Sequence, residues 1–225
     1  NEWFVMTLAG ECGLDVPPVD IKYFPEPAYI IERFDRKGNH PLQQRLHVLD
    51  GCQLLNYPHS TKYHNNNAAS LVNLVNKTRT KAKTLLEIFR WACFNAIVGN
   101  GDAHLKNLSF FIRKDYISMT PHYDLLSTAI YEDTGKHLNH ALSQEMGGAK
   151  ILAELKREHV LEFAAELGIK QKLAASTLDR LINKIVPSST SMLKIAEGEL
   201  THGEVRTLSE IHYNCIIEMS DKLRK

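Results

Sequence analysis

The most constrained stretch of the sequence is an apolar helix that ends in a short polar loop. Residues 84–99 carry apolar side chains at helical spacing, and Thr84 with Glu87 matches the capping box of a helix start. Gly99 is a typical helix end, because glycine takes left-handed backbone angles without strain. A helix with a buried stripe is a rigid base, so the polar side chains that follow it are expected to be held in place.

Around this helix, the sequence predicts an α+β chain with a strand-bearing start and a large helical body. Apolar periodicity predicts helices over residues 2–13, 84–99, 156–168, 171–186 and 205–223, and strands over 19–24, 28–34, 108–113 and 116–120. Polar or glycine-bearing composition predicts loops over residues 37–43, 59–67 and 135–148. The last two strands are expected to form a tight hairpin.

Composition narrows the class of protein. Of the 225 residues, 44% are hydrophobic and 24% are charged, and a chain of this length and composition can bury a core. Its net charge of +1 provides no overall positive potential that would attract nucleic acid. No apolar run reaches the roughly 18 residues of a membrane span. The four scattered cysteines favour buried thiols in a reducing cytoplasm over disulfides or zinc. Because the chain does not begin with Met, we expect the natural protein to start further upstream.

Three polar residues near the predicted hairpin suggest phosphate chemistry. Asp102 and Asn107 lie five residues apart in the polar loop, and Asp124 follows the hairpin, 22 residues after Asp102. A protein kinase catalytic loop has the same Asp-x-x-x-x-Asn spacing, and a hairpin then leads to a metal-binding Asp. Amide and carboxylate oxygens are the ligands that Mg²⁺ prefers.

The strings that contain these residues resemble one family. NGDAHLKN, followed by PHYDLLS, is similar to the signature of HipA-like serine/threonine kinase toxins of bacterial toxin–antitoxin systems. The string IERFDR, at residues 31–36, resembles the hinge between the two lobes in that family. The resemblance covers residues 1–130 clearly, and the compact spacing is similar to the short HipT toxin of HipBST systems.

The resemblance implies a bilobal protein-kinase-like fold. Residues 1–35 would complete the small N-lobe and hinge, and residues 36–225 would form a mostly helical C-lobe with the catalytic loop. The phosphate-covering Gly-rich loop and the ATP-binding lysine of a kinase are not in this sequence, and we expect them upstream.

The family also implies a role for each site residue. These are Asp102 as catalytic base, His104 as a phosphate-side contact, Asn107 and Asp124 as metal ligands, Glu32 and Phe34 as hinge contacts to adenine, and Glu2 as the acid that pairs with the ATP-binding lysine. The implied activity is Mg²⁺-dependent transfer of the ATP γ-phosphoryl group to a Ser/Thr hydroxyl of an aminoacyl-tRNA synthetase. The implied partner is an antitoxin of the HipB or HipS type, with no direct contact to nucleic acid or membrane.

Other interpretations of the same residues stay open. The chain could be a pseudokinase, or another module that binds nucleotide or antitoxin without phosphotransfer, or a metal-dependent hydrolase that uses the Asp102-x-His104 pair. Asp102 could simply brace a turn, His104 could be a structural histidine, and Phe34 could belong to the core. His137 and His140 are expected to lie in a solvated loop.

Overall fold

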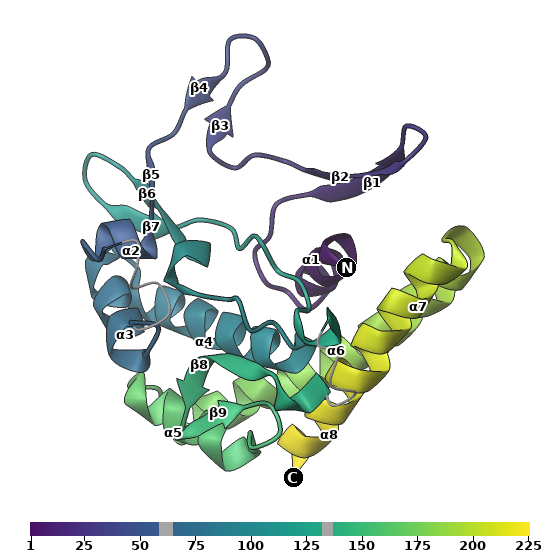
Figure 1. Cartoon of the computed structure of the whole chain (residues 1–225). Coiled ribbons are helices and arrows are strands. Elements are labelled where there is room, and N and C mark those ends of the chain that lie inside the picture. The colour runs from purple at the N-terminus through teal and green to yellow at the C-terminus, as the bar shows by residue number, and fades with distance from the viewer. Residues whose placement is uncertain (59–64, 132–136) are drawn as a thin grey trace.

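The computed structural model describes residues 1–58, 65–131 and 137–225 and shows a mixed fold with a predominantly helical body (Figure 1). The helices are α1 (Glu2–Glu11), α2 (Gly51–Leu54), α3 (Ala68–Lys77), α4 (Lys81–Val98), α5 (Arg157–Glu166), α6 (Gln171–Glu199), α7 (His202–Glu210) and α8 (Glu218–Arg224). A π-helical stretch, Ile211–Ile217, joins α7 to α8. In the described ranges, no helix is both long and apolar enough to cross a membrane.

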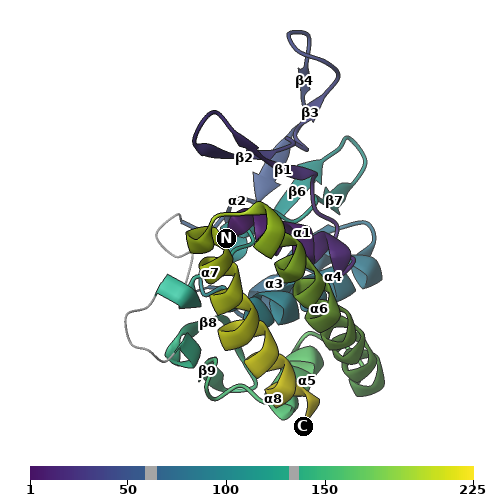
Figure 2. The same cartoon turned by 90° about the vertical axis from the view of Figure 1, so that its right-hand side faces the viewer.

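The strands form four small antiparallel sheets. They are β1 (Val19–Tyr23) with β2 (Pro27–Ile31), β3 (Arg36–Lys37) with β4 (Gln44–Arg45), the trio β5 (Val48–Asp50), β6 (Ser109–Ile112) and β7 (Ile117–Met119), and β8 (Ala141–Met146) with β9 (Ala149–Ile151). The first two pairs project from one end of the helical body, as both views show (Figures 1 and 2). The hairpin of β6 and β7 confirms its prediction.

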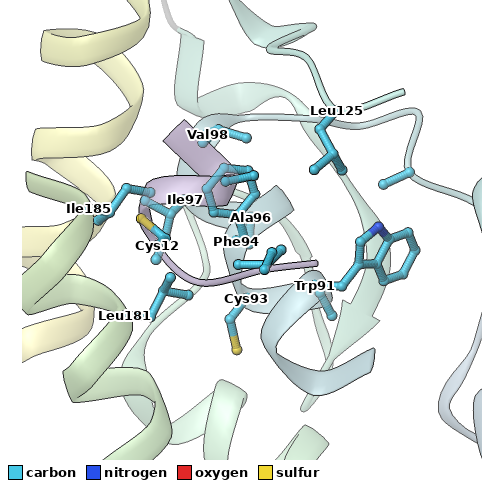
Figure 3. Packing of buried hydrophobic residues seen from close by; sticks show 14 of the residues in the cluster. Cys12, Trp91, Cys93, Phe94, Ala96, Ile97, Val98, Leu125, Leu181 and Ile185 are labelled. Atoms are coloured by element: carbon cyan, nitrogen blue, oxygen red, sulfur yellow. The ribbon is translucent and has the colours of Figure 1, made fainter. Parts of the chain in front are cut away.

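Helix α4 is the centre of the core because most of its surface is apolar. Its side chains Trp91, Phe94 and Ile97 are fully buried. Helix α4 packs against α6, and Figure 3 shows Leu181 and Ile185 of α6 on that side of the cluster. Gly99 ends the helix with a φ of 70°, as predicted.

The predicted start of α4 was wrong. The helix begins at Lys81, so Thr84 lies in its first turns and is buried, where its hydroxyl accepts a hydrogen bond from Thr78 at 3.2 Å. Glu87 does not cap the helix: its Oε1 lies 3.6 Å from the Arg90 Nη1. The Thr-x-x-Glu pattern was therefore used for contacts inside the fold, which a local pattern does not distinguish from a cap.

Two further predictions need correction. Helix α6 does not stop at Val186 but continues through Pro187 to Glu199, because buried residues such as Leu193 extend its apolar stripe. The predicted loop over 135–148 contains β8, since Gly147 and Gly148 have φ of 51° and 83° and turn the chain into β9.

The predicted loop over 59–67 is only partly described. Residues 59–64 lie outside the described residues, but Asn66 is buried at 7% exposure and Asn67 caps α3 by accepting from the Ser70 N–H at 3.0 Å. The end of this segment is therefore part of the packed structure and not an exposed loop.

Candidate active site

The polar loop after α4 is anchored on that helix by a chain of amide side chains. Asn95 donates to the Trp91 carbonyl at 2.8 Å, and Asn100 donates to the Asn95 oxygen at 2.8 Å. The Asn100 oxygen accepts from the Asp102 N–H at 3.1 Å. Because Asn95 and Asn100 are buried, this chain of hydrogen bonds fixes the backbone at Asp102.

A second set of contacts, from distant segments, holds the next residues of the loop. The carbonyl of Ala103 accepts hydrogen bonds from the side chains of Asn66 and Gln144. Gln144 is fully buried on β8, and Asn66 precedes α3. Sequence reasoning missed both residues, because an asparagine or glutamine in a predicted loop carries no signal of its partner.

His140 has a similar bracing position, which corrects its assignment to a solvated loop. Its ring Nε2 is 2.6 Å from the Thr128 hydroxyl, and Thr128 in turn accepts from the Gly101 N–H at 2.8 Å. A side chain at position 101 would collide with the His140 ring, so glycine is required there. The side chain of His137 lies outside the described residues.

Asp102 and His104 lie side by side at the opening of the loop. The Asp102 Oδ1 is 3.6 Å from the His104 Nε2, and the two side chains are 48% and 9% exposed. An accessible carboxylate beside a buried imidazole can contact a substrate hydroxyl while the histidine supports it. This geometry fits the predicted catalytic pair, whose roles stay a prediction.

Asn107 and Asp124 meet in space, as the predicted metal pair requires. The Asn107 side-chain amide donates to the Asp124 Oδ2. Asn107 is buried in the short 3-10 helix Leu105–Asn107, whereas Asp124 follows β7 and is exposed. Asp124 has a φ of 58°, a left-handed conformation that aspartate tolerates better than most residues.

Tyr123 joins the two halves of this pair. Its hydroxyl donates to the Lys106 carbonyl at 2.7 Å and lies 2.7 Å from the Ser109 hydroxyl. The first of these contacts joins the neighbours of the two candidate ligands, because Tyr123 precedes Asp124 and Lys106 precedes Asn107. The strand register and this tyrosine together fix the separation of the two candidate ligands.

Glu2 also lies at this site. Burial, and then the negative charge of Asp124, raise the pKa of Glu2 above its usual range. Asn1 positions this end of the chain, because its side chain donates to the Ser127 carbonyl at 2.7 Å and accepts from the Ser127 N–H at 2.9 Å. Tyr29 of β2 lies close to Glu2. Burial, and then the charge of the Glu2 carboxylate, raise the pKa of Tyr29 above its usual range.

The predicted hinge residues, Glu32 and Phe34, lie just after β2, which ends at Ile31. The Glu32 N–H donates to the Pro18 carbonyl at 2.9 Å. Because Pro18 has no N–H, it cannot donate a hydrogen bond back to the Glu32 carbonyl. The Phe34 ring packs 6.0 Å from Phe111 and 5.5 Å from Tyr123, measured between centroids. The side chain of Phe34 therefore stabilises the site by packing, and backbone contacts of Glu32 and Phe34 to adenine stay a prediction.

Gly51 of α2 packs against the backbone of the polar loop at Leu105, so a substitution at Gly51 tests how tightly the loop is packed. A Cβ at this position would lie 2.5 Å from the Leu105 carbonyl oxygen and 3.1 Å from the Leu74 side chain. We expect Gly51→Ala to lower the free energy of unfolding by about 1–3 kcal/mol, because the obstructing oxygen belongs to the backbone beside Asn107. Chemical denaturation measures the change.

Gly198→Ala is the matched control, because a Cβ there meets nothing within 4 Å. It should leave the free energy of unfolding unchanged or raise it by less than about 1 kcal/mol, because Gly198 lies in the last turn of α6, where replacing a glycine stabilises less than in a helix interior. A Gly51→Ala variant as stable as the parent would show that the loop yields easily at Leu105.

Comparison with known proteins places this site in a family. A family model described as HipA-like C-terminal domain matches residues 1–188. The chain is 34% identical over 203 residues to the serine/threonine-protein kinase toxin HipA of Shewanella oneidensis, covering 82% of this chain and 46% of that protein. It is 33% identical over 214 residues to the putative kinase Y4mE of Sinorhizobium fredii, covering 90% and 50%.

Solved structures show the same relationship. A complex of Shewanella oneidensis HipA with HipB and operator DNA contains a chain that matches with a TM-score of 0.88 at 26% identity, over 100% of this chain and 55% of that one. The Helicobacter pylori proinflammatory kinase CtkA matches with a TM-score of 0.62 at 12% identity, over 99% and 82%, which shows a shared fold.

The chain spans about half the length of the curated relatives it matches. Its match to the family model covers the candidate catalytic loop, the β6–β7 hairpin and Asp124. The chain belongs to the HipA-like C-terminal domain family, whose members include a serine/threonine kinase toxin.

Proposed function

We propose that the chain carries the catalytic centre of an ATP-dependent serine/threonine protein kinase, the toxin of a bacterial type II toxin–antitoxin system. The observation that supports this most is the direct contact between Asn107 and Asp124, with Asp102 on the same loop as Asn107. Separate segments supply these groups, and kinases use the same order of base, amide and carboxylate. In this proposal the fold is bilobal, with residues 1–35 ending the N-lobe and residues 36–225 forming the C-lobe.

The residues present fit a magnesium ion. Among the residues that the structure describes, the Asn107 Oδ1 is buried and has no hydrogen-bond partner, while its amide nitrogen already contacts Asp124. An amide oxygen beside a carboxylate is a donor set that a hard cation prefers. Asn107 and Asp124 would hold Mg²⁺, which neutralises charge on the ATP phosphates when bound.

The other residues would bind and orient the reactants. Asp102 would accept the proton of the attacking hydroxyl, and His104, buried beside Asp102, would be a phosphate-side contact. Glu2, close to Asp124, would pair with the ATP-binding lysine, and Glu32 with Phe34 would contact adenine from the hinge backbone. Catalysis would come mainly from positioning and charge neutralisation.

One solved relative supports a proposal for the antitoxin partner. The Shewanella oneidensis HipA structure includes HipB and operator DNA. For this chain we propose an antitoxin partner of the HipB or HipS type, DNA contact through that antitoxin, and an aminoacyl-tRNA synthetase as substrate. The four described cysteines are all buried free thiols, which supports a cytoplasmic location. Membership of the short HipT subgroup stays a prediction.

The two alternative functions, pseudokinase and metal-dependent hydrolase, are separated from the kinase by different observations. A pseudokinase would bind nucleotide at the same residues without transfer, so only an activity measurement separates it. A transition-metal hydrolase would need three or more converging His, Cys, Asp or Glu ligands, and the described part of the chain contains no such group. The kinase proposal is therefore favoured over the hydrolase.

Labelled ATP tests the proposed function directly. The protein as its gene encodes it should transfer the γ-phosphoryl group to itself or to a bacterial aminoacyl-tRNA synthetase in the presence of Mg²⁺, and EDTA should abolish the transfer. Mg²⁺-dependent nucleotide binding without any transfer would support the binding module instead. Duplex DNA binding by the isolated chain, lost steeply as salt rises, would contradict indirect DNA contact.

A further inference from the structure

One exposed corner of the molecule carries a high density of positive charge. It lies where the start of α4 meets the β6–β7 hairpin, because the Arg79 N–H donates to the Ile117 carbonyl at 3.0 Å. Its segments, 77–83 and 113–116, contain a single acidic residue, Asp115, whereas the whole chain holds 27 basic and 26 acidic residues. The rest of the molecule is therefore net negative. We call the exposed basic side chains of these two segments the basic corner: Lys77, Arg79, Lys81, Lys83, Arg113 and Lys114.

The charge of the basic corner is not neutralised by the fold. Across the described ranges 1–58, 65–131 and 137–225, none of its six side chains forms an ion pair with a carboxylate. Other exposed bases do find such partners, since Arg206 lies 3.1 Å from Glu210 and Arg224 lies 3.1 Å from Asp221. The cations of the corner are therefore available to a second molecule.

The start of α4 shows that this charge does not serve the helix. Thr80 is the N-cap residue, but its side chain makes no capping hydrogen bond, and the first turn contains no acidic residue. Lys81 and Lys83 lie instead at the positive end of the helix dipole, where cations are unfavourable. Helix α7, in contrast, begins with a capping box and has Glu204 in its first turn. A charge pattern that opposes local stability points to a role outside the fold.

Aromatic rings hold two arginines of the corner in place. The Arg79 guanidinium lies 5.3 Å from the centroid of the Tyr116 ring, and the Arg113 guanidinium lies 4.9 Å from that of Phe111. The Arg113 N–H also donates to the Tyr116 carbonyl at 3.0 Å. Because stacking already restricts these side chains, they lose less conformational entropy when a guanidinium binds a carboxylate.

A groove continues from the corner along the helical body. Lys83 is part of the wall of this groove, which has a volume of about 580 Å³ and lies between α4 and α6, and its α6 side includes Arg180 and Lys184. The acidic wall residues, Glu11 and Glu87, each lie within 4.0 Å of a base of the same groove. An extended segment bound at the corner would therefore have room to continue without meeting an unpaired carboxylate.

We propose that the basic corner is a docking surface for an acidic segment of a protein partner. Charge complementarity supports this occupant, because a few Asp or Glu residues in an extended segment would match cations confined to two short stretches. A nucleic acid duplex fits less well, since it is longer than the corner and its outlying phosphates would face the net negative remainder of the molecule. The proposal does not rest on the proposed kinase function.

Fluorescence anisotropy with a labelled decapeptide of alternating Glu and Asp tests the docking surface. The protein as its gene encodes it should bind this peptide, and it should not bind a decapeptide of alternating Gln and Asn. Raising the salt concentration from about 50 to about 200 mM should weaken the binding, because exposed ion pairs are screened. A DNA duplex of about 20 base pairs and vesicles that contain phosphatidylserine are measured beside the peptide to compare other polyanions.

The double variant Lys81→Glu with Lys83→Glu should weaken binding of the acidic peptide about tenfold, because each change replaces an attraction by a repulsion. Acidic residues are favourable at a helix start, so the urea midpoint of this variant should equal or exceed that of the parent. Lys172→Glu with Lys194→Glu makes the same charge change at exposed positions of α6 and is the matched control. It should weaken binding less than about twofold.

Several results would overturn the proposal. They are no binding of the acidic peptide by the parent, equal binding by the parent and the Lys81/Lys83 double variant, and an equal loss in the control, which would indicate overall net charge. Tighter binding of the duplex or the vesicles than of the peptide, lost in the same double variant, would assign the corner to another class of polyanion.

Lys114→Glu keeps the proposal testable if the double variant has a lowered urea midpoint. Lys114 is exposed in the turn between β6 and β7 and lies outside the helices. This variant should weaken peptide binding about threefold, the effect of reversing one exposed charge. Binding at the parent affinity would contradict the docking surface.

Discussion

Replacing Asp102 by asparagine should slow phosphoryl transfer by about 10²–10⁴-fold, the contribution of a positioned acid–base group. Affinity for Mg-ATP should stay near that of the parent. The structure gives the reason: the Asp102 N–H donates to the Asn100 side chain, a contact that an asparagine at position 102 keeps, and the Asp102 side chain is 48% exposed. The change therefore removes the proton acceptor and leaves the loop in place.

The measurement combines calorimetry of nucleotide binding, with and without Mg²⁺, and transfer from labelled ATP. His104→Ala is the companion variant, because it removes the 3.6 Å contact to Asp102 without removing the carboxylate. It should slow transfer less than Asp102→Asn does. Loss of Mg-ATP binding in Asp102→Asn would contradict the assignment of this residue as the base, and transfer at the parent rate would contradict the kinase proposal itself.

Replacing Asp124 by asparagine should weaken both Mg²⁺-dependent nucleotide binding and turnover. The change removes a negative charge from the candidate metal site and weakens the contact with the Asn107 amide. Hydrogen bonds to charged groups contribute about 1.5–3 kcal/mol, so a loss of about 10–100-fold in Mg-ATP affinity is expected. Binding of nucleotide without Mg²⁺ should change much less.

Asp115→Asn is the charge-matched control for this variant, because Asp115 is exposed in the turn between β6 and β7. It should leave nucleotide affinity and turnover at the parent values. If Asp124→Asn binds Mg-ATP and transfers phosphate as the parent does, Asp124 is not a metal ligand. If the control is equally impaired, general electrostatics and not coordination would explain the effect.

The sequence by itself determined the elements and residues that depend on near neighbours. The core of α4, its end at Gly99 and the hairpin of β6 and β7 follow from apolar periodicity and from residue types with particular backbone angles. The spacing of Asp102, Asn107 and Asp124 predicted a shared site, and the contact between Asn107 and Asp124 agrees with it. Local patterns carry this information because the hairpin between these residues is itself local.

Only the tertiary structure decided what supports the site. Asn66 and Gln144 meet at the Ala103 carbonyl from positions 37 and 41 residues away, and His140 packs against Gly101. The continuation of α6 through Pro187 also depends on its burial. A polar side chain in a loop, or a proline after a helix, has the same local signal whether or not a distant partner stabilises it. These features were decided by packing between remote segments, where the free energy of burial and hydrogen bonding outweighs local preference.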